Sequence, residues 1–168
     1  MDALTVSAEC RLAPAKVNLA LHVVGRRDDG YHLLESLVVF DAVASDEVVV
    51  RPRGDDTSLR DLEAGIDRLG VSGRFASSVP TGDGNILLQA AALARAELAK
   101  FGLSLPPLDI ALTKHLPVAA GIGGGSADAA ALLALVAADA PGAARTALAA
   151  AAIRLGADVP MCLEGRAA

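Results

Sequence analysis

The fold is decided around one glycine-rich stretch, Leu116-Pro117-Val118-Ala119-Ala120-Gly121-Ile122-Gly123-Gly124-Gly125-Ser126-Ala127. A run that predicts a strand, 108–112, precedes it, and a run that predicts a helix, 126–138, follows it. Glycine lets backbone N–H groups approach an anion with no Cβ in the way, and a helix start adds unpaired N–H groups and the positive end of its dipole. The pattern predicts a phosphate-binding loop, with Ser126 as a helix cap or as a hydroxyl donor to a phosphate oxygen.

The loop has three other possible interpretations. A P-loop requires a lysine directly after its last glycine, whereas Gly125 is followed by Ser126. A dinucleotide-binding fingerprint that starts at Gly121 requires a third glycine where Ser126 stands. The third alternative is a tight turn without a ligand, but a turn needs only one or two glycines, and each further glycine costs backbone entropy. Phosphate binding is the hypothesis that the pattern favours.

Strands and helices are mixed along the chain without strict alternation, which favours an α+β fold over a doubly wound parallel sheet. The alternation of Val17, Leu19, Leu21 and Val23 with polar or small residues predicts a half-buried strand. Strands are expected at residues 9–24, 31–40, 46–51, 71–75, 108–112 and 161–163, the first two as a hairpin. Helices are expected at residues 85–101, 126–138 and from the 141–142 break to about 155, with Asp83 or Asn85 capping the first and Gly102 ending it.

Three polar residues outside the loop are candidates for chemistry. Lys16 and Asn18 lie two residues apart in an otherwise apolar strand, so their side chains share one face. Asp158, in Gly156-Ala157-Asp158-Val159-Pro160, follows a helix and precedes an apolar run. Each has a simpler explanation, because Lys16 could be an edge-strand lysine with a solvated head group and Asp158 a turn or capping residue.

The bulk composition narrows the class of protein. Hydrophobic residues make up 53% of the 168 residues and aromatic residues 2%, so a core of alanine, leucine and valine is expected. The net charge is −5 and no basic block stands out, which argues against a nucleic-acid or membrane-surface binder. Cys10 and Cys162 are predicted to be free thiols. With no signal peptide and no apolar run near the roughly 20 residues of a membrane span, a soluble, cytoplasmic protein is expected.

Three blocks, in this order, resemble the GHMP kinases, the class named for galactokinase, homoserine, mevalonate and phosphomevalonate kinases. They are Pro14-Ala15-Lys16-Val17-Asn18-Leu19 running on to Asp29-Gly30-Tyr31-His32, then residues 114–130, then residues 156–160. The wider class usually shows two serines after Gly-Leu-Gly, whereas Gly123 is followed here by Gly124, Gly125 and Ser126. That triple glycine and the Asp29–His32 block are most similar to members that phosphorylate a diphosphocytidyl sugar alcohol.

The resemblance implies a fold and a reaction. The fold is a GHMP-kinase N-terminal lobe, a mixed β-sheet packed with helices that resembles the domain-2-like fold of a small-subunit ribosomal protein. The reaction is transfer of the γ-phosphate of ATP, with Mg²⁺, to the 2-hydroxyl of 4-diphosphocytidyl-2-C-methyl-D-erythritol in isoprenoid-precursor synthesis. A mevalonate- or homoserine-type kinase and a non-catalytic nucleotide-binding module remain the alternatives.

The resemblance also assigns roles to residues. Asp158 is expected to accept the hydroxyl proton, and Lys16 to stabilise both Asp158 and the transferring phosphoryl group. Asn18 is expected to contact the substrate, Tyr31 and His32 to line a cytidine pocket, and residues 117–127 to hold the ATP phosphates. No protein ligand for a metal is identified.

The family's chains continue beyond this length with a second lobe. Residues 1–168 are therefore expected to form the N-terminal ATP-binding lobe, without the C-terminal lobe that completes the substrate cleft. On that expectation the isolated chain binds nucleotide weakly and phosphorylates substrate very slowly or not at all. The oligomeric state is left open, a homodimer included.

Overall fold

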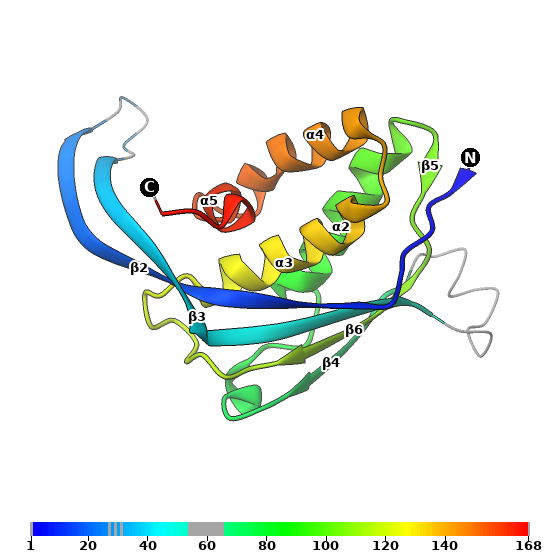
Figure 1. The fold of residues 1–168 in the computed structure, drawn as a ribbon, viewed down its shortest axis with the longest axis horizontal. Helices are drawn as coiled ribbons and strands as arrows, with labels where there is room; N and C mark the ends of the chain where they lie inside the picture. Colours follow the sequence, from blue (N-terminus) through cyan, green and yellow to red (C-terminus); the bar gives the residue numbers. More distant parts are fainter. Residues whose placement is uncertain (1, 27, 29, 31, 54–65, 168) are drawn as a thin grey trace.

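The computed structural model describes residues 2–26, 28, 30, 32–53 and 66–167. Its strands are β1 Asp2–Ala3, β2 Glu9–Arg26, β3 His32–Pro52, β4 Arg68–Ser72, β5 Leu103–Ser104 and β6 Leu108–Thr113. Its helices are η1 Ala76–Ser78, α2 Ile86–Ala99, α3 Gly124–Ala138, α4 Gly142–Ala151, η2 Ala152–Arg154 and α5 Val159–Glu164. Helices α2 to α5 lie together on one side of β2, β3, β6 and β4 (Figure 1), and the predicted α+β class is confirmed.

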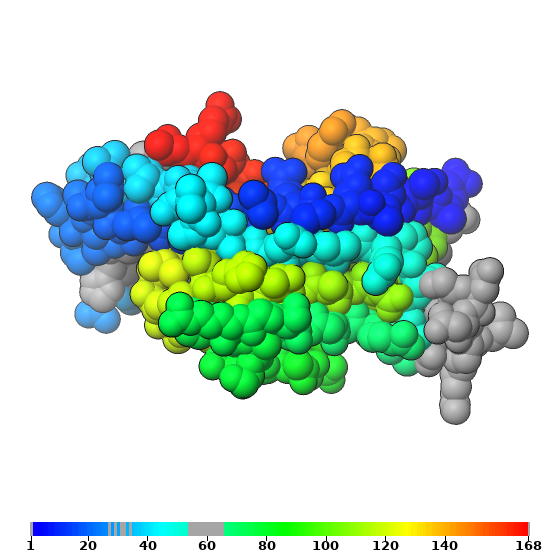
Figure 2. All heavy atoms as spheres, turned by 60° about the horizontal axis from the view of Figure 1, so that its bottom comes forward, coloured from blue at the N-terminus to red at the C-terminus, as the bar shows by residue number. Residues whose placement is uncertain are grey.

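The main sheet has four strands in the order β2-β3-β6-β4. The pairs β2–β3 and β3–β6 are antiparallel, whereas β4 runs parallel to β6, so the sheet is mixed. Figure 2 turns the lower side of Figure 1 forward and shows the strands as bands in this same order, blue, cyan, yellow-green and green. β1 and β5 form a separate two-residue parallel ladder.

The core lies between the sheet and the helices. Val48, Val50 and Leu112 alternate with more exposed residues and are buried on the helical side. Above them α3 is buried around most of its circumference, because small alanines let β2, β3, α2 and α5 approach it closely. The glycine-rich stretch therefore leads directly into the central helix of the molecule.

The two extended runs expected at 31–40 and 46–51 are a single strand, β3, which corrects the sequence-based prediction. The pairing register with β2 shifts next to Pro14, where Pro14 pairs with Ser45 and Ala15 pairs with Asp41. Proline has no N–H for the ladder, so an irregularity is expected there. The Asp41 Oδ1 atom accepts hydrogen bonds from the N–H groups of Val43 (2.9 Å) and Ala44 (3.2 Å), which satisfies the bulged backbone.

The outer half of the β2–β3 hairpin is not half-buried, which is a second correction. Leu19, Leu21 and Val23 are 60%, 48% and 61% exposed, and the intervening residues are exposed as well. The hairpin extends past the helical layer and curves upward at its tip (Figure 1), so neither of its faces is covered by the helices. Alternation predicted the strand correctly but could not show that no core lies against it.

The helix boundaries differ from expectation at two places. The apolar run 161–163, predicted as a strand, lies in α5, where Pro160 occupies the first turn and Gly165 closes the helix at φ 61°. A short apolar run fits a strand or a helix equally well, whereas proline near a helix start is favourable. α3 begins at Gly124, two residues earlier than predicted, so Ser126 lies inside the helix and does not cap it.

The remaining elements follow the predictions more closely. The Asn85 side chain caps α2 by accepting a hydrogen bond from the Leu87 N–H group at 2.8 Å, and Gly102 follows the helix at φ 71°. β6 covers the predicted strand 108–112, whereas β4 lies three residues before the predicted 71–75. Within the described ranges, no helix has the length and apolar character that a bilayer crossing requires.

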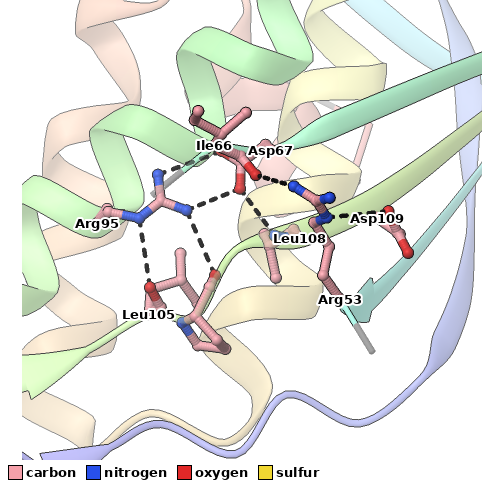
Figure 3. A network of polar contacts seen from close by, with 8 residues as sticks. Arg53, Ile66, Asp67, Arg95, Leu105, Leu108 and Asp109 are labelled. Carbon is pink, nitrogen blue, oxygen red and sulfur yellow. Dashed lines mark hydrogen bonds and ion pairs between the residues drawn. The ribbon is translucent and has the colours of Figure 1, made fainter. Parts of the chain in front are cut away.

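A polar network near Leu108, the first residue of β6, connects α2 to the sheet (Figure 3). The Arg95 guanidinium of α2 donates to both carboxylate oxygens of Asp67, at 2.8 and 3.2 Å, and Asp67 also accepts a hydrogen bond from the Leu108 N–H group. Arg53 donates to the Ile66 carbonyl oxygen at 3.0 Å. These contacts fix the approach to β4 at the opposite end of β6 from the glycine-rich stretch.

Candidate active site

The glycine loop, defined here as residues 114–123, connects the end of β6 to the start of α3. Three of its residues have positive φ: Ala119 (59°), Gly121 (75°) and Gly123 (66°). Glycine adopts these angles without a steric penalty, whereas the alanine is strained by about 1 kcal/mol. The backbone is therefore held in a specific, partly strained shape, as is common at binding sites.

The first turn of α3, directly after the loop, presents free amides. Gly123 is the N-cap residue of α3, and the Ala127 N–H group makes the first helical hydrogen bond, to the Gly123 carbonyl oxygen at 2.8 Å. The amides of Gly124, Gly125 and Ser126 precede that bond and have no partner within the helix. They suit an anion, while the amide of Ala127, predicted to contact phosphate, is already bonded.

A cavity of about 360 Å³ lies against the loop. It is lined by ten of the eleven residues predicted to hold ATP phosphates, 117–126, whereas Ala127 is buried outside it. An apolar wall comes from residues that the sequence did not single out, namely Val79, Pro80, Ile86, Leu87 and Leu112. Glycine amides on one side and an apolar wall on the other form a pocket for a ligand that is part anion and part flat apolar ring.

Lys16 and Asp158, 142 positions apart in the sequence, lie together beside this loop. The Lys16 Nζ atom is 3.0 Å from the Asp158 Oδ2 atom, with side-chain exposures of 6% and 44%. The Lys16 N–H group donates to the Ile122 carbonyl oxygen at 2.8 Å, and a Cβ added to Gly123 would lie 3.0 Å from the Lys16 Cβ atom. The backbone of the loop therefore packs directly on the lysine of the pair.

The Asp158 side chain does not cap α5, although Asp158 is the N-cap residue of that helix. Its carboxylate faces Lys16 instead, so the capping explanation does not apply. Cys162, one turn further along α5, has a thiol pKa raised to about 11 by burial and by the nearby Asp158 charge. It stays protonated near neutral pH and is no competing nucleophile.

The predicted substrate residues are only partly placed. Asn18 lies near Lys16 as predicted, with the Lys16 Nζ atom 3.4 Å from the Asn18 Oδ1 atom. His32 begins β3 and pairs with Arg26 across the hairpin, but its side chain lies outside the described residues. Tyr31 also lies outside them, so the cytidine pocket stays a prediction.

A second group of charges, not predicted from the sequence, lies under the loop. The Lys114 Nζ atom lies 2.5 Å from the Asp46 Oδ2 atom and 2.7 Å from the Asp128 Oδ2 atom, and all three residues are buried. Lys114 and Asp128 also line the cavity. Two of these residues left a signal in the sequence, because Lys114 follows a strand and Asp128 is an acidic residue in an alanine-rich helix. Asp46 left no such signal, since it lies 68 positions before Lys114.

Comparison with known proteins gives consistent matches to one group of kinases. The family description "GHMP kinases N terminal domain" matches residues 85–166. A 4-diphosphocytidyl-2-C-methyl-D-erythritol kinase of Brucella melitensis is 51% identical over 158 residues, 94% of this chain and 48% of the relative. The chain therefore contains a GHMP kinase N-terminal domain. A protein of the same name from Gluconacetobacter diazotrophicus is 50% identical over 163 residues, 93% of this chain and 50% of the relative.

Two solved kinase structures share this fold. A crystal structure of 4-(cytidine 5'-diphospho)-2C-methyl-D-erythritol kinase matches 95% of this chain and 50% of its own chain, with a TM-score of 0.66 and 38% identity. The homoserine kinase of Cytophaga hutchinsonii matches with a TM-score of 0.54 at 17% identity, which shows a shared fold alone. The chain spans about half the length of the curated relatives it matches.

Proposed function

We propose that this chain is the N-terminal, ATP-binding lobe of a kinase that phosphorylates the 2-hydroxyl of 4-diphosphocytidyl-2-C-methyl-D-erythritol. The observation that carries the proposal is the 3.0 Å contact between Lys16 and Asp158 beside a glycine loop that opens a helix. The names of relatives about 50% identical to this chain support the choice of substrate. The reaction belongs to the non-mevalonate isoprenoid precursor pathway, and the expected location is the cytoplasm.

The glycine loop and the cavity would hold the nucleotide. The amides of Gly124, Gly125 and Ser126 donate to phosphate oxygens, the α3 dipole adds to their attraction, and the Ser126 hydroxyl offers a further donor. The apolar wall by Ile86 and Leu87 receives the base. Because Mg²⁺ in kinases is held largely by phosphates and water, it would offset phosphate charge here, and no protein ligand for it is assigned.

The Lys16–Asp158 pair would carry the transfer step. The substrate 2-hydroxyl oxygen bonds to the γ-phosphorus while the bond from that phosphorus to the β,γ-bridging oxygen breaks, and ADP leaves with the electrons of that bond. Asp158 accepts the hydroxyl proton as the new bond forms, since a carboxylate is too weak a base to ionise the alcohol beforehand. Lys16 offsets negative charge on the transferring oxygens, and its buried stem limits its movement.

The substrate would enter from the open side of Asp158, whose carboxylate is partly exposed. Asn18, whose Oδ1 atom lies 3.4 Å from the Lys16 Nζ atom, would hydrogen-bond the substrate near its reacting hydroxyl. Tyr31 and His32 are proposed to contact the cytidine base. The remaining residues around the substrate would belong to a second lobe.

The test is a coupled ADP-release assay on two proteins. One is the 168-residue chain, and the other, the hybrid enzyme, is this chain joined to the C-terminal half of the Brucella melitensis relative. We expect the hybrid enzyme to phosphorylate 4-diphosphocytidyl-2-C-methyl-D-erythritol in preference to mevalonate or homoserine, and the chain alone to be very slow. Equal rates would mean that a second lobe is dispensable, and preference for mevalonate or homoserine would refute the substrate assignment.

A further inference from the structure

A buried ion cluster, formed by Lys114, Asp46 and Asp128, joins three elements at one point under the glycine loop. Lys114 follows β6, Asp46 belongs to β3 and Asp128 belongs to the second turn of α3. Their side chains are almost completely buried, and the Lys114 Nζ atom bonds to a carboxylate oxygen of each aspartate. Burying charges is costly, so a cluster of this kind needs close contacts between its members, which it has.

The same cluster contacts both ends of the loop. The Asp46 Oδ1 atom accepts hydrogen bonds from the N–H groups of His115 (2.6 Å) and Leu116 (2.8 Å), the first residues after Lys114. At the other end, a Cβ added to Gly124 would lie 3.2 Å from the Lys114 Nζ atom. The segment between these points has exposed residues from Val118 to Gly121, so its shape depends on how its two ends are held.

The cluster is also unbalanced in charge. One ammonium faces two carboxylates, and the Asp128 Oδ1 atom is buried without a hydrogen-bond partner in the structure. Asp128 and Lys114 line the cavity together with the amides that suit an anion. When both carboxylates are ionised, the cluster places a net negative charge beside the site proposed for phosphates, which opposes an anionic ligand.

We propose that the Lys114–Asp46–Asp128 cluster positions the glycine loop and that its net charge sets the affinity of the loop for nucleotide phosphates. Lys114 and Asp46 are then positioning residues that hold the loop ends, and Asp128 is the member whose charge varies. The inference rests on the proposed nucleotide site and extends it to the groups beneath it.

The sign of the effect follows from the surroundings of Asp128. Burial raises the pKa of its carboxyl to about 7, the nearby Lys114 opposes that rise, and Asp46 adds to it. Two further titratable groups come from elements packed nearby. Lys16 of β2 lies against Gly123, and Cys162 of α5 is close enough for Asp128 to help raise the pKa of its thiol. Because an anionic ligand favours the protonated, neutral carboxyl, nucleotide affinity should fall as the pH rises through 7.

The first experiment measures ADP binding to the 168-residue chain by calorimetry at pH 6 and pH 8.5. Asp128→Asn keeps an oxygen for Lys114 but cannot ionise, and the titration of ADP itself is common to all variants. Relative to Asp128→Asn, we expect the affinity of the unsubstituted chain to fall about three- to tenfold between the two pH values, since one pKa unit of coupling equals a factor of ten. Asp139→Asn, an exposed aspartate at the far end of α3, should behave like the unsubstituted chain.

The outcomes separate the two proposals. If the unsubstituted chain binds no ADP at either pH, the proposed nucleotide site is wrong and this inference falls with it. If it binds ADP but Asp128→Asn shows the same pH dependence, the nucleotide site stands and only the role of the cluster is refuted.

A second experiment tests the positioning of the loop without nucleotide. Lys114→Met removes the cation, and amide hydrogen exchange of peptides covering residues 115–124 should accelerate at least tenfold over the unsubstituted chain. Lys100→Met, which removes the ion pair between the exposed Lys100 and Glu97 of α2, should leave that exchange unchanged. Unchanged exchange in a folded Lys114→Met chain would refute the positioning role, and if that variant does not fold, the Asp128→Asn measurement decides.

Discussion

Two lysine–aspartate groups flank the glycine loop, and they differ in their access to water. Lys16 and Asp158 meet beside Gly123, with the Asp158 side chain 44% exposed, whereas Lys114, Asp46 and Asp128 meet beneath Gly124 and are buried. Asp158 can meet a substrate from solvent, while the buried cluster acts on a ligand through its charge and through the loop that it holds. The same residue types therefore suit chemistry on one side of the loop and architecture on the other.

The comparison also explains how one loop can serve both groups. The Lys16 N–H group bonds to the Ile122 carbonyl oxygen near the end of the loop, and Asp46 bonds to the amides of His115 and Leu116 at its start. A change in either group should reach the other through the loop backbone. The following predictions test this division, in order of decreasing effect.

The largest effect is expected at Gly123, which lies against Lys16 of the Lys16–Asp158 pair. In Gly123→Val, a β-branched residue at φ 66° is strained, and its Cβ atom would lie 3.0 Å from the Lys16 Cβ atom. We expect ADP binding to be lost in calorimetry while circular dichroism is unchanged. Gly82→Val, at a glycine with no neighbouring atom within 4 Å, is the control and should bind normally. Unchanged affinity in Gly123→Val would contradict phosphate binding by this loop.

Removing each lysine should separate the two groups by stability. Lys114→Met leaves two buried carboxylates without a cation and should lower the free energy of unfolding by about 3–5 kcal/mol. Lys16→Met leaves only the partly exposed Asp158, which water can solvate, so about 1 kcal/mol or less is expected. Urea unfolding of the two variants measures the difference. Equal losses would show that the buried cluster is no more structural than the exposed pair.

The pH dependence of stability should identify Asp128. Its pKa is about 7 in the folded chain and near the ordinary 3.8 when unfolded, so the folded chain holds the extra proton between these values. The contribution of Asp128 to the free energy of unfolding therefore falls as the pH rises from about 4 to 7 and is constant above. Asp128→Asn should lack this fall. Thermal unfolding at pH 5 and pH 8 gives the comparison, and parallel curves for both proteins would refute it.

The smallest effect is expected at Ala119, in the exposed part of the loop. Glycine at this position removes the strain of φ 59°, about 1 kcal/mol, but adds unfolded-state entropy of about 0.5–1 kcal/mol. Ala119→Gly should leave the unfolding free energy unchanged or raise it by a few tenths of a kcal/mol. Ala120, the next residue, does not have a positive φ, so Ala120→Gly relieves no strain. It only adds entropy to the unfolded state and should lower the free energy of unfolding. The reverse order in urea unfolding would contradict the assigned backbone.

The local sequence pattern was sufficient to predict the Lys16–Asp158 pair but not the buried cluster. The glycine loop and the polar Lys16, Asn18 and Asp158 stand out in short apolar segments, and the loop and these residues do lie together. The buried cluster depends on the register of β3 against β6, which places Asp46 beside residues about 70 positions away. A single sequence carries no sign of such a long-range pairing.

Two of the errors in the predicted fold have the same cause. The continuity of β3 depends on the Asp41 side chain satisfying a bulge opposite Pro14, and the exposed hairpin tip depends on where the helices end. The helical form of α5 was within reach of the sequence, since Pro160 and Gly165 are typical of a short helix with a glycine stop. Apolar periodicity identifies elements but does not show what covers them.

The central claim is that the Lys16–Asp158 pair performs the chemistry. The turnover of Asp158→Asn in the hybrid enzyme tests this claim most directly. The amide keeps the size of the side chain but cannot accept the hydroxyl proton, so kcat should fall at least ~10²-fold with a much smaller change in KM. Asp139→Asn in the same enzyme should retain its turnover. If Asp158→Asn retains kcat within about tenfold of the unsubstituted hybrid enzyme, Asp158 is not the proton acceptor and the account of the exposed pair is wrong.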